Sequence, residues 1–181
     1  MPGIDESIPF RPVKIAILTV SDSRTLEDDR SGNILVDRVV EYGHELAARA
    51  IVKDEMVDII AQLEHWIDDQ AIEAVISTGG TGVTGRDITP EAFAQVYEKE
   101  VAGFGELFRM LSYKIIGTST IQSRATAGVA KGTYLFALPG SPGACKDGWD
   151  LILKDQLDIR HKPCNFAELM PRLREHEVAN S

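Results

Sequence analysis

The stretch that decides the fold runs from Ser77 to Ala92 and reads STGGTGVTGRDITPEA. Before it, the short apolar run from Glu73 to Ser77 is typical of a buried strand. After its four glycines, Thr89 suits the N-cap of a helix and Pro90 its first position. A strand, a glycine loop and a helix start in this order bring backbone N–H groups together. The stretch therefore predicts an anion-binding loop from Gly79 to Ile88.

Two charged residues, Arg86 and Asp87, follow the last glycine. A cation to hold phosphate and a carboxylate to hold a metal ion are what phosphoryl chemistry requires, which favours this interpretation over a flexible turn. The spacing from Gly80 to Gly85 also matches the GxGxxG dinucleotide fingerprint. In that fold the third glycine already lies in the helix, whereas Pro90 predicts a later helix start. We therefore set nicotinamide binding aside.

Length and composition bound the domain count and the partners. At 181 residues the chain fits one domain, and its 28 acidic and 19 basic side chains give a net charge of -9 with a pI near 4.9. This balance excludes the basic surface that binders of nucleic acid or anionic membranes need, so we expect a small-molecule ligand. No apolar run approaches the ~20 residues of a membrane span, and we expect a cytoplasmic protein.

Cysteine and histidine positions indicate neither a disulfide framework nor a metal site. The two cysteines are too few for a framework, and the four histidines are scattered without ligand spacing. We therefore predict structural roles for Cys145, Cys164, His44, His65, His161 and His176.

Upstream of the glycine loop, strands and helices alternate. The β-branched run from Val13 to Val20 predicts a central strand, and Ser31 suits the N-cap of a helix that ends near Tyr42. A strand from Glu45 to Val52 and a helix from Met56 to Ile67 follow. The polar loop from Ser21 to Gly32 is as compatible with solvated surface as with a function.

Downstream of the loop, apolar stripes predict one helix that reaches Val101 and another from Phe104 to Leu111. The stretch from Gly117 to Ala130 is rich in small polar residues, and Thr133 to Leu138 returns as a strand. That strand ends on a second glycine turn, in which Ser141 suits a helix N-cap. Two helix N-termini at strand ends could together bind two anionic groups of one extended ligand.

The alternation predicts the α/β class. We place an N-terminal extension at residues 1–12, a single ligand-binding domain at 13–166 and a C-terminal tail at 167–181. The tail has weak periodicity, which leaves an edge helix, a partner-facing segment and a disordered end as alternatives.

Several separate motifs occur in one order: LTVSDSR, DDRSG, IVKDE, GGTGVTGRDITPEA, QSRATAG and ALPGSPGA. With them, the chain from about Ile15 to Asn165 resembles the MoaB/Mog family of molybdenum cofactor biosynthesis proteins. The segments GFGE, RMLS, IGTST and KPCNF make it most similar to the MoaB branch. The resemblance implies a three-layer α/β/α molybdopterin-binding fold with a mostly parallel sheet.

The resemblance also implies molybdopterin adenylylation. In that reaction the terminal phosphate of the pterin attacks the α-phosphorus of ATP in the presence of Mg²⁺, giving adenylyl-molybdopterin and pyrophosphate. By position, Asp54 and Asp87 match the two essential carboxylates of the family, which implies catalytic and metal-holding roles. Ser123 matches a serine at the pterin site, and Arg124 beside it is a candidate for phosphate binding.

The other candidate binding residues come from the two glycine turns: Gly79, Gly80, Thr81, Gly82, Gly140 and Ser141. Two alternatives stay open for single residues. Ser112 lies in a setting similar to that of Ser123, and Asp54 is also placed to cap a helix.

Two alternatives to the enzyme also stay open. One is a non-catalytic molybdopterin-binding or scaffold protein of the same fold, which leaves Asp54 and Asp87 unexplained. The other, an assembly module, rests only on the weakly patterned tail. The resemblance further implies a trimer-based assembly, and the MoaB branch implies a homohexamer, which we adopt as the expectation.

Overall fold

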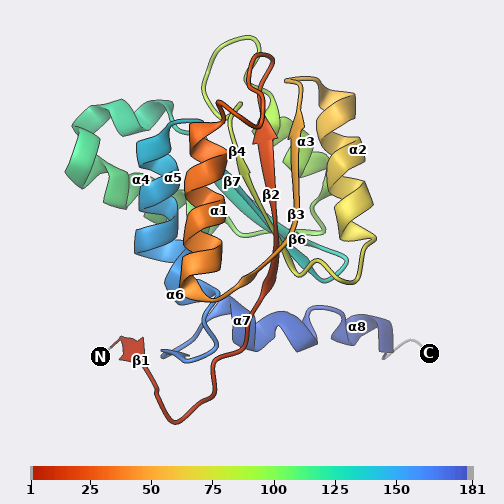
Figure 1. The fold of residues 1–181 in the computed structure, drawn as a ribbon, viewed down its shortest axis with the longest axis vertical. Helices are drawn as coiled ribbons and strands as arrows, with labels where there is room; N and C mark the ends of the chain where they lie inside the picture. The colour runs from red at the N-terminus through yellow and green to blue at the C-terminus, as the bar shows by residue number, and fades with distance from the viewer. Residues whose placement is uncertain (1, 179–181) are drawn as a thin grey trace.

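A computed structural model describes residues 2–178, and residues 1 and 179–181 lie outside the description. Six strands form a central sheet in the order β3-β2-β4-β7-β6-β5 (Figure 1). They are β2 (Lys14–Val20), β3 (Glu45–Val52), β4 (Ala74–Thr78), β5 (Lys99–Glu100), β6 (Thr126–Ala130) and β7 (Thr133–Leu138). The first four in sheet order are parallel, whereas β6 runs antiparallel to both of its neighbours. The predicted α/β class with a mostly parallel sheet is confirmed.

Helices cover both faces of the sheet (Figure 1). The longer ones are α1 (Arg30–Tyr42), α2 (Met56–Ile67), α3 (Thr89–Val96), α4 (Ala102–Ile116) and α5 (Pro142–Gly148). A 3₁₀ segment (Gly117–Gln122) extends α4, and a π-helical segment (Trp149–Leu153) with α6 (Lys154–Gln156) extends α5. The boundaries of β3, β7 and α2 agree with the sequence prediction.

The alternation of side chains along the strands creates two separate cores. On β2, Ile15 and Ile17 are buried with the apolar residues of α1, α4 and α5, whereas Ala16 and Leu18 are buried with those of α2 and α3. Successive residues of a strand face opposite sides, so a strand between two helix layers is apolar throughout. The three-layer arrangement follows from this pattern.

The first helix starts earlier than predicted. It begins at Arg30, and its N-cap is Asp29 rather than Ser31. The buried Asp29 side chain accepts the N–H of Gly32 at 2.9 Å. Aspartate and serine are both good N-caps, so the sequence alone could not rank two candidates that are two residues apart.

The cap predicted at Thr89 is wrong, whereas the one at Ser141 is confirmed. Helix α3 begins at Thr89 itself, and the preceding Ile88 makes no side-chain cap bond. The Thr89 hydroxyl instead donates to the carbonyl of Gly79 at 2.9 Å and so closes the base of the loop. The Ser141 hydroxyl accepts the N–H of Ala144 at 3.2 Å.

The region after α3 was predicted least well. Helix α3 ends at Val96, so Val101 does not belong to it, and the chain forms the short strand β5 before α4. Strand β6 arises within the segment of small polar residues. A Cβ atom on Gly128 would lie 2.4 Å from the Tyr97 ring, so only glycine allows this close approach. The small residues that allow β6 to pack here have low strand propensity, so the sequence pattern did not predict this strand.

The two ends of the described chain lie at the end of the sheet opposite the glycine loops (Figure 1). Strand β1 (Gly3–Ile4) pairs antiparallel with β8 (His161–Lys162). The C-terminal part forms α7 (Phe166–Leu169), a 3₁₀ turn (Met170–Arg172) and α8 (Glu175–Val178). Among the described residues, no helix has both the length and the apolar character needed to cross a membrane.

Candidate ligand-binding site

The site forms where the carboxyl ends of β2, β4 and β7 meet, which is the usual ligand position in open parallel sheets. The two glycine turns touch there, because Gly79 donates its N–H to the carbonyl of Leu138 at 3.1 Å. A Cβ atom on Gly140 would lie 3.2 Å from the Cα atom of Gly79. The prediction that two strand ends share one site is therefore consistent with the geometry.

Two residues of the loop must be glycine. Gly79 has φ +102°, and a Cβ atom there would lie 2.2 Å from the carbonyl oxygen of Val20. Gly80 has φ +64°, and a Cβ atom would lie 2.3 Å from the Thr89 hydroxyl. The left-handed backbone at both positions, and the close contacts with Val20 and Thr89, exclude any residue that has a Cβ atom. The loop is therefore held in one shape by its surroundings.

A cavity of about 370 Å³ opens in front of this loop. Its volume is within the ~300–1,000 Å³ of small-molecule pockets. Of the predicted site residues it is lined by Gly80, Thr81, Gly82, Asp87, Ser123, Gly140 and Ser141. The cavity thus brings together most of the residues chosen from the sequence. Gly79, Asp54 and Arg124 do not line it.

Asp87 is fixed at the edge of the cavity by the loop that precedes it. Its Oδ2 accepts the N–H of Thr84 at 2.8 Å and the Thr84 hydroxyl at 2.6 Å. Burial favours a higher pKa for Asp87, but the hydrogen bonds from Thr84 and Gly82 outweigh it and lower the pKa below its ordinary value. Asp87 is therefore a fixed negative charge at neutral pH.

Asp54 lies between β3 and α2, close to Gly80: its Oδ1 is 3.1 Å from the position of a Cβ atom there. The alternative that Asp54 caps α2 is not what the structure shows, because the N-cap is Glu55, whose side chain makes no cap bond to the helix. Burial first, and then the charges of Asp22 and Asp87, raise the pKa of Asp54. The negative charge of Asp54 is thus poorly compensated by the protein alone.

These two carboxylates fit Mg²⁺, which in nucleotide sites takes one or two carboxylates together with phosphate oxygens. No group of three or more His, Cys, Asp or Glu side chains within residues 2–178 forms a ready-made metal cage. Asp54 is half-buried and repelled by Asp87, so a bound cation would stabilise its ionised form more than that of Asp87. We take the pair as the candidate metal ligands.

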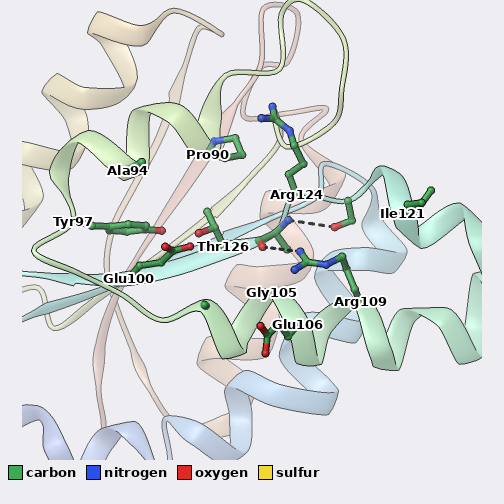
Figure 2. A pocket seen from close by; sticks show the side chains of 13 residues that line it. Pro90, Ala94, Tyr97, Glu100, Gly105, Glu106, Arg109, Ile121, Arg124 and Thr126 are labelled. Atoms are coloured by element: carbon green, nitrogen blue, oxygen red, sulfur yellow. Dashed lines mark hydrogen bonds between the residues drawn. The ribbon is translucent and has the colours of Figure 1, made fainter.

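Arg124 holds the glycine loop by hydrogen bonds and does not line the cavity. Its Nε donates to the carbonyl of Gly82 at 2.6 Å and its Nη2 to that of Asp87 at 2.7 Å, while Nη1 pairs with Glu91. In Figure 2 its side chain turns away from Arg109. The guanidinium is thus already bonded on three sides, and phosphate binding by Arg124 stays a prediction without support from these contacts.

Both candidate serines line the same cavity. Ser112 is buried on α4, and Ser123 is half-buried, with its hydroxyl accepting the N–H of Ala125 at 3.3 Å. The choice between Ser112 and Ser123 for the pterin therefore stays open on geometry.

A larger cavity of about 690 Å³ lies between α3, the start of α4 and the segment that leads into β6 (Figure 2). Tyr97, Arg109 and Thr126 line it, and Arg109 donates to the carbonyl of Ala125 at 3.3 Å. Of the predicted site residues it contains only Ser123 and Arg124. We assign the site to the smaller cavity, because the glycine turns and Asp87 face that one.

The sequence left open whether the polar loop from Ser21 to Gly32 is solvated surface or has a function. With Thr19, Gly79 and Gly140, this loop lines a further cavity of about 290 Å³. Its Asp29 is buried, where it accepts the Thr19 hydroxyl at 2.6 Å and the Arg49 guanidinium at 3.0 Å. The two adjacent acids in DDRSG were the only signal in the sequence for this role. They do not show which one is buried, and a buried aspartate needs hydrogen-bond partners such as Thr19 and Arg49.

The fold and the cavity define an α/β domain with a cavity beside a glycine loop at the carboxyl edge of its parallel strands. Residues 16–159 match the family described as Probable molybdopterin binding domain, and the chain belongs to this family. It is 52% identical over 160 residues to molybdenum cofactor biosynthesis protein B of Escherichia coli (strain K12), covering 88% of this chain and 94% of that one. The Bacillus subtilis (strain 168) protein of the same name is 47% identical over 146 residues, covering 80% and 86%. The resemblance to the MoaB branch is thereby confirmed.

Solved structures agree. A crystal structure of a molybdenum cofactor biosynthesis protein B is 35% identical, with a TM-score of 0.83 over 91% of this chain and 98% of that one. The tungsten cofactor synthesizing protein MoaB from Pyrococcus furiosus is 34% identical, with a TM-score of 0.71 over 80% and 92%.

Proposed function

We propose that this protein acts in molybdenum cofactor biosynthesis by adenylylating molybdopterin with ATP in the presence of Mg²⁺. The family and the names of its relatives support the pathway and the pterin ligand. The observation that carries the reaction is Asp87, a fixed carboxylate on the cavity wall beside backbone N–H groups of the glycine loop. Beyond its bonds to Thr84, this carboxylate has no role toward the ligand in a non-catalytic pterin-binding protein.

In this proposal the protein contributes position and charge. The pterin phosphate binds near the start of α5, where Ser141 begins the helix and the helix dipole favours anions. Asp54 and Asp87 would hold Mg²⁺, which when bound neutralises charge on the triphosphate. The pterin phosphate oxygen then attacks the α-phosphorus, the bond to the bridging oxygen breaks, and pyrophosphate leaves.

The proposal is tested by incubating the purified protein with molybdopterin, ATP and Mg²⁺. We expect equimolar pyrophosphate and AMP-linked pterin, and neither product when EDTA removes the metal. Binding of the pterin without either product would instead support the alternative of a non-catalytic molybdopterin-binding or scaffold protein.

We further propose that the protein is a trimer-based homo-oligomer, a hexamer built from two trimers. Exposed apolar side chains of α4 and the following 3₁₀ segment support an oligomer: Met110, Tyr113 and Ile116 are exposed, and Ile121 is 81% exposed. Light scattering should give a mass that is a multiple of three chains, and a stable monomer would contradict the proposal.

A further inference from the structure

Arg86 connects three loops at the carboxyl edge of the sheet. Its Nε and Nη2 donate to both carboxylate oxygens of Asp22 at 2.9–3.0 Å, and its Nη1 donates to Glu55 at 2.9 Å. Asp22 also accepts the backbone N–H of Asp54 at 3.3 Å. One guanidinium therefore joins the loop after β2, the loop after β3 and the glycine loop, and Asp87 is its neighbour in sequence.

The second arginine near this loop has different partners. Arg124 donates to the backbone carbonyls of Gly82 and Asp87, which are fixed parts of the loop. Arg86 donates only to side-chain carboxylates among the described residues, and its side chain is 55% exposed. Exposed ion pairs contribute only ~0–1 kcal/mol to the free energy of unfolding, so Arg86 can exchange these carboxylates for another partner with little loss of stability.

The surroundings of Arg86 carry an excess of negative charge. Asp22, Glu55 and Asp54 all lie beside it, and the charge of Asp22 opposes the ionisation of Asp54. In the ligand-free protein the guanidinium therefore supplies the positive charge that a divalent cation would supply near Asp54. A cation held by Asp54 and Asp87 and the Arg86 guanidinium therefore neutralise the same acidic surroundings, and each weakens the need for the other.

We propose that Arg86 is an exchangeable clamp that neutralises Asp22 and Glu55 in the ligand-free protein and transfers its guanidinium to a phosphate oxygen when the Mg²⁺-nucleotide binds. This inference rests on the proposed nucleotide site. The exchange is favourable because Mg²⁺ at Asp54 and Asp87 then supplies positive charge to these acidic surroundings, while charge-assisted bonds from arginine to phosphate are stronger than its exposed pairs. No covalent bond changes in this step.

The test measures the binding of two probes by calorimetry in wild type and Arg86→Gln. The first probe, Mg²⁺ alone, should bind about threefold tighter to the variant, because a competing cation is gone. The second, the Mg²⁺ complex of a non-cleavable ATP analogue, should bind about tenfold weaker, because one charge-assisted bond to phosphate is lost. Opposite shifts for the two probes are the signature of an exchange.

Arg124→Gln is the matched control for structural damage. It should lower the melting temperature by about 5 °C, whereas Arg86→Gln should change it by less than about 2 °C. Equal weakening of both probes together with a large loss of thermal stability would show that Arg86 is structural. Unchanged affinity for the nucleotide would likewise overturn the exchange.

The same data separate this inference from the proposed reaction. A wild-type protein that binds the Mg²⁺-nucleotide but forms no AMP-linked pterin overturns the adenylylation, and opposite shifts in Arg86→Gln still support the exchange. A protein that transfers AMP while Arg86→Gln binds both probes like wild type overturns the exchange alone.

Discussion

Two arginine–aspartate pairs lie at opposite ends of the central sheet and differ in burial. At the carboxyl end, the side chains of Arg86 and Asp22 are 55% and 45% exposed. At the amino end, those of Arg160 and Asp158 are 27% and 0% exposed. The same chemical pair is thus exchangeable at the ligand-binding end and fixed at the end where the chain termini pack.

Burial is what separates the two roles. Burial alone would raise the pKa of Asp158, but the bonds from Arg160 and from the Tyr42 hydroxyl outweigh it and lower the pKa. Removing one partner of such a pair leaves a buried group unsatisfied, whereas an exposed group finds water. The comparison therefore predicts functional losses at the carboxyl end and stability losses at the amino end.

The largest effect is expected for Asp54→Asn at the carboxyl end. The amide keeps the shape of the side chain but cannot supply the negative charge that the metal needs. AMP transfer should fall about a thousandfold, which corresponds to ~4 kcal/mol of transition-state stabilisation. Its melting temperature should be equal to that of wild type or higher, because an uncompensated charge is removed. A steady-state assay at saturating ATP checks the rate, and transfer within a few-fold of wild type contradicts the metal role.

At the amino end, Asp158→Ala should lower the free energy of unfolding by about 3 kcal/mol, because Arg160 and Tyr42 lose a shared buried partner. Urea titration measures this. The matched control is Asp22→Ala at the carboxyl end, for which we expect less than about 1 kcal/mol. Equal losses of unfolding free energy in the two variants would show that the two arginine–aspartate pairs do not differ in their contribution to stability.

A pH-dependent effect is expected from His44, which packs against Phe10, Tyr42 and Trp149 at the amino end. Burial lowers the pKa of His44 from 6.5 to about 4. Between these pH values the unfolded chain binds a proton that the native protein excludes, so stability falls as the pH falls. The full contribution of neutral His44 to the free energy of unfolding is present above pH 6.5, and about 3 kcal/mol should be lost by pH 4.

His44→Asn isolates this contribution, because the asparagine Oδ1 lies near the position of His44 Nδ1 and can still accept the N–H of Val13, which His44 Nδ1 accepts at 3.0 Å. The difference in unfolding free energy between wild type and variant should shrink as the pH falls over that interval. A difference that is constant with pH rules out His44 as the source.

The smallest effect is expected within the cavity itself. Ser123→Ala should weaken molybdopterin binding by about fivefold, or ~1 kcal/mol, through the loss of one hydroxyl, and should leave ATP binding unchanged. Fluorescence titration with the pterin measures the affinity. If Ser112→Ala shows this loss and Ser123→Ala does not, the roles of the two serines are reversed.

Local signals in the sequence predicted the main elements and the glycine loop. The boundaries of β3, β7 and α2 followed from apolar periodicity, and the loop followed from glycines that the backbone geometry requires. Strand β6 was missed, because the small residues that let it pack against Tyr97 carry no strand signal. The secondary structure of such a segment depends on its tertiary packing and not on its local propensity.

The partners of charged side chains could not be predicted. Asp22 and Arg86 are far apart in the sequence, and nothing in the pattern shows that they meet. Arg124 was chosen for phosphate because it is a cation near the site, yet it is bonded to carbonyls of the loop. Long-range contacts of this kind follow from how the loops are brought together, and only the structure shows that.

The central claim is tested most directly by AMP transfer in Asp87→Asn measured beside wild type, together with the melting temperature and pterin affinity of both. The amide oxygen can still accept from Thr84, so the fold and pterin binding should be close to wild type. Turnover should fall about a thousandfold, because the charge that holds the metal is gone. AMP transfer close to the wild-type rate would contradict the proposed function, and a large loss of thermal stability would show that Asp87 serves the fold.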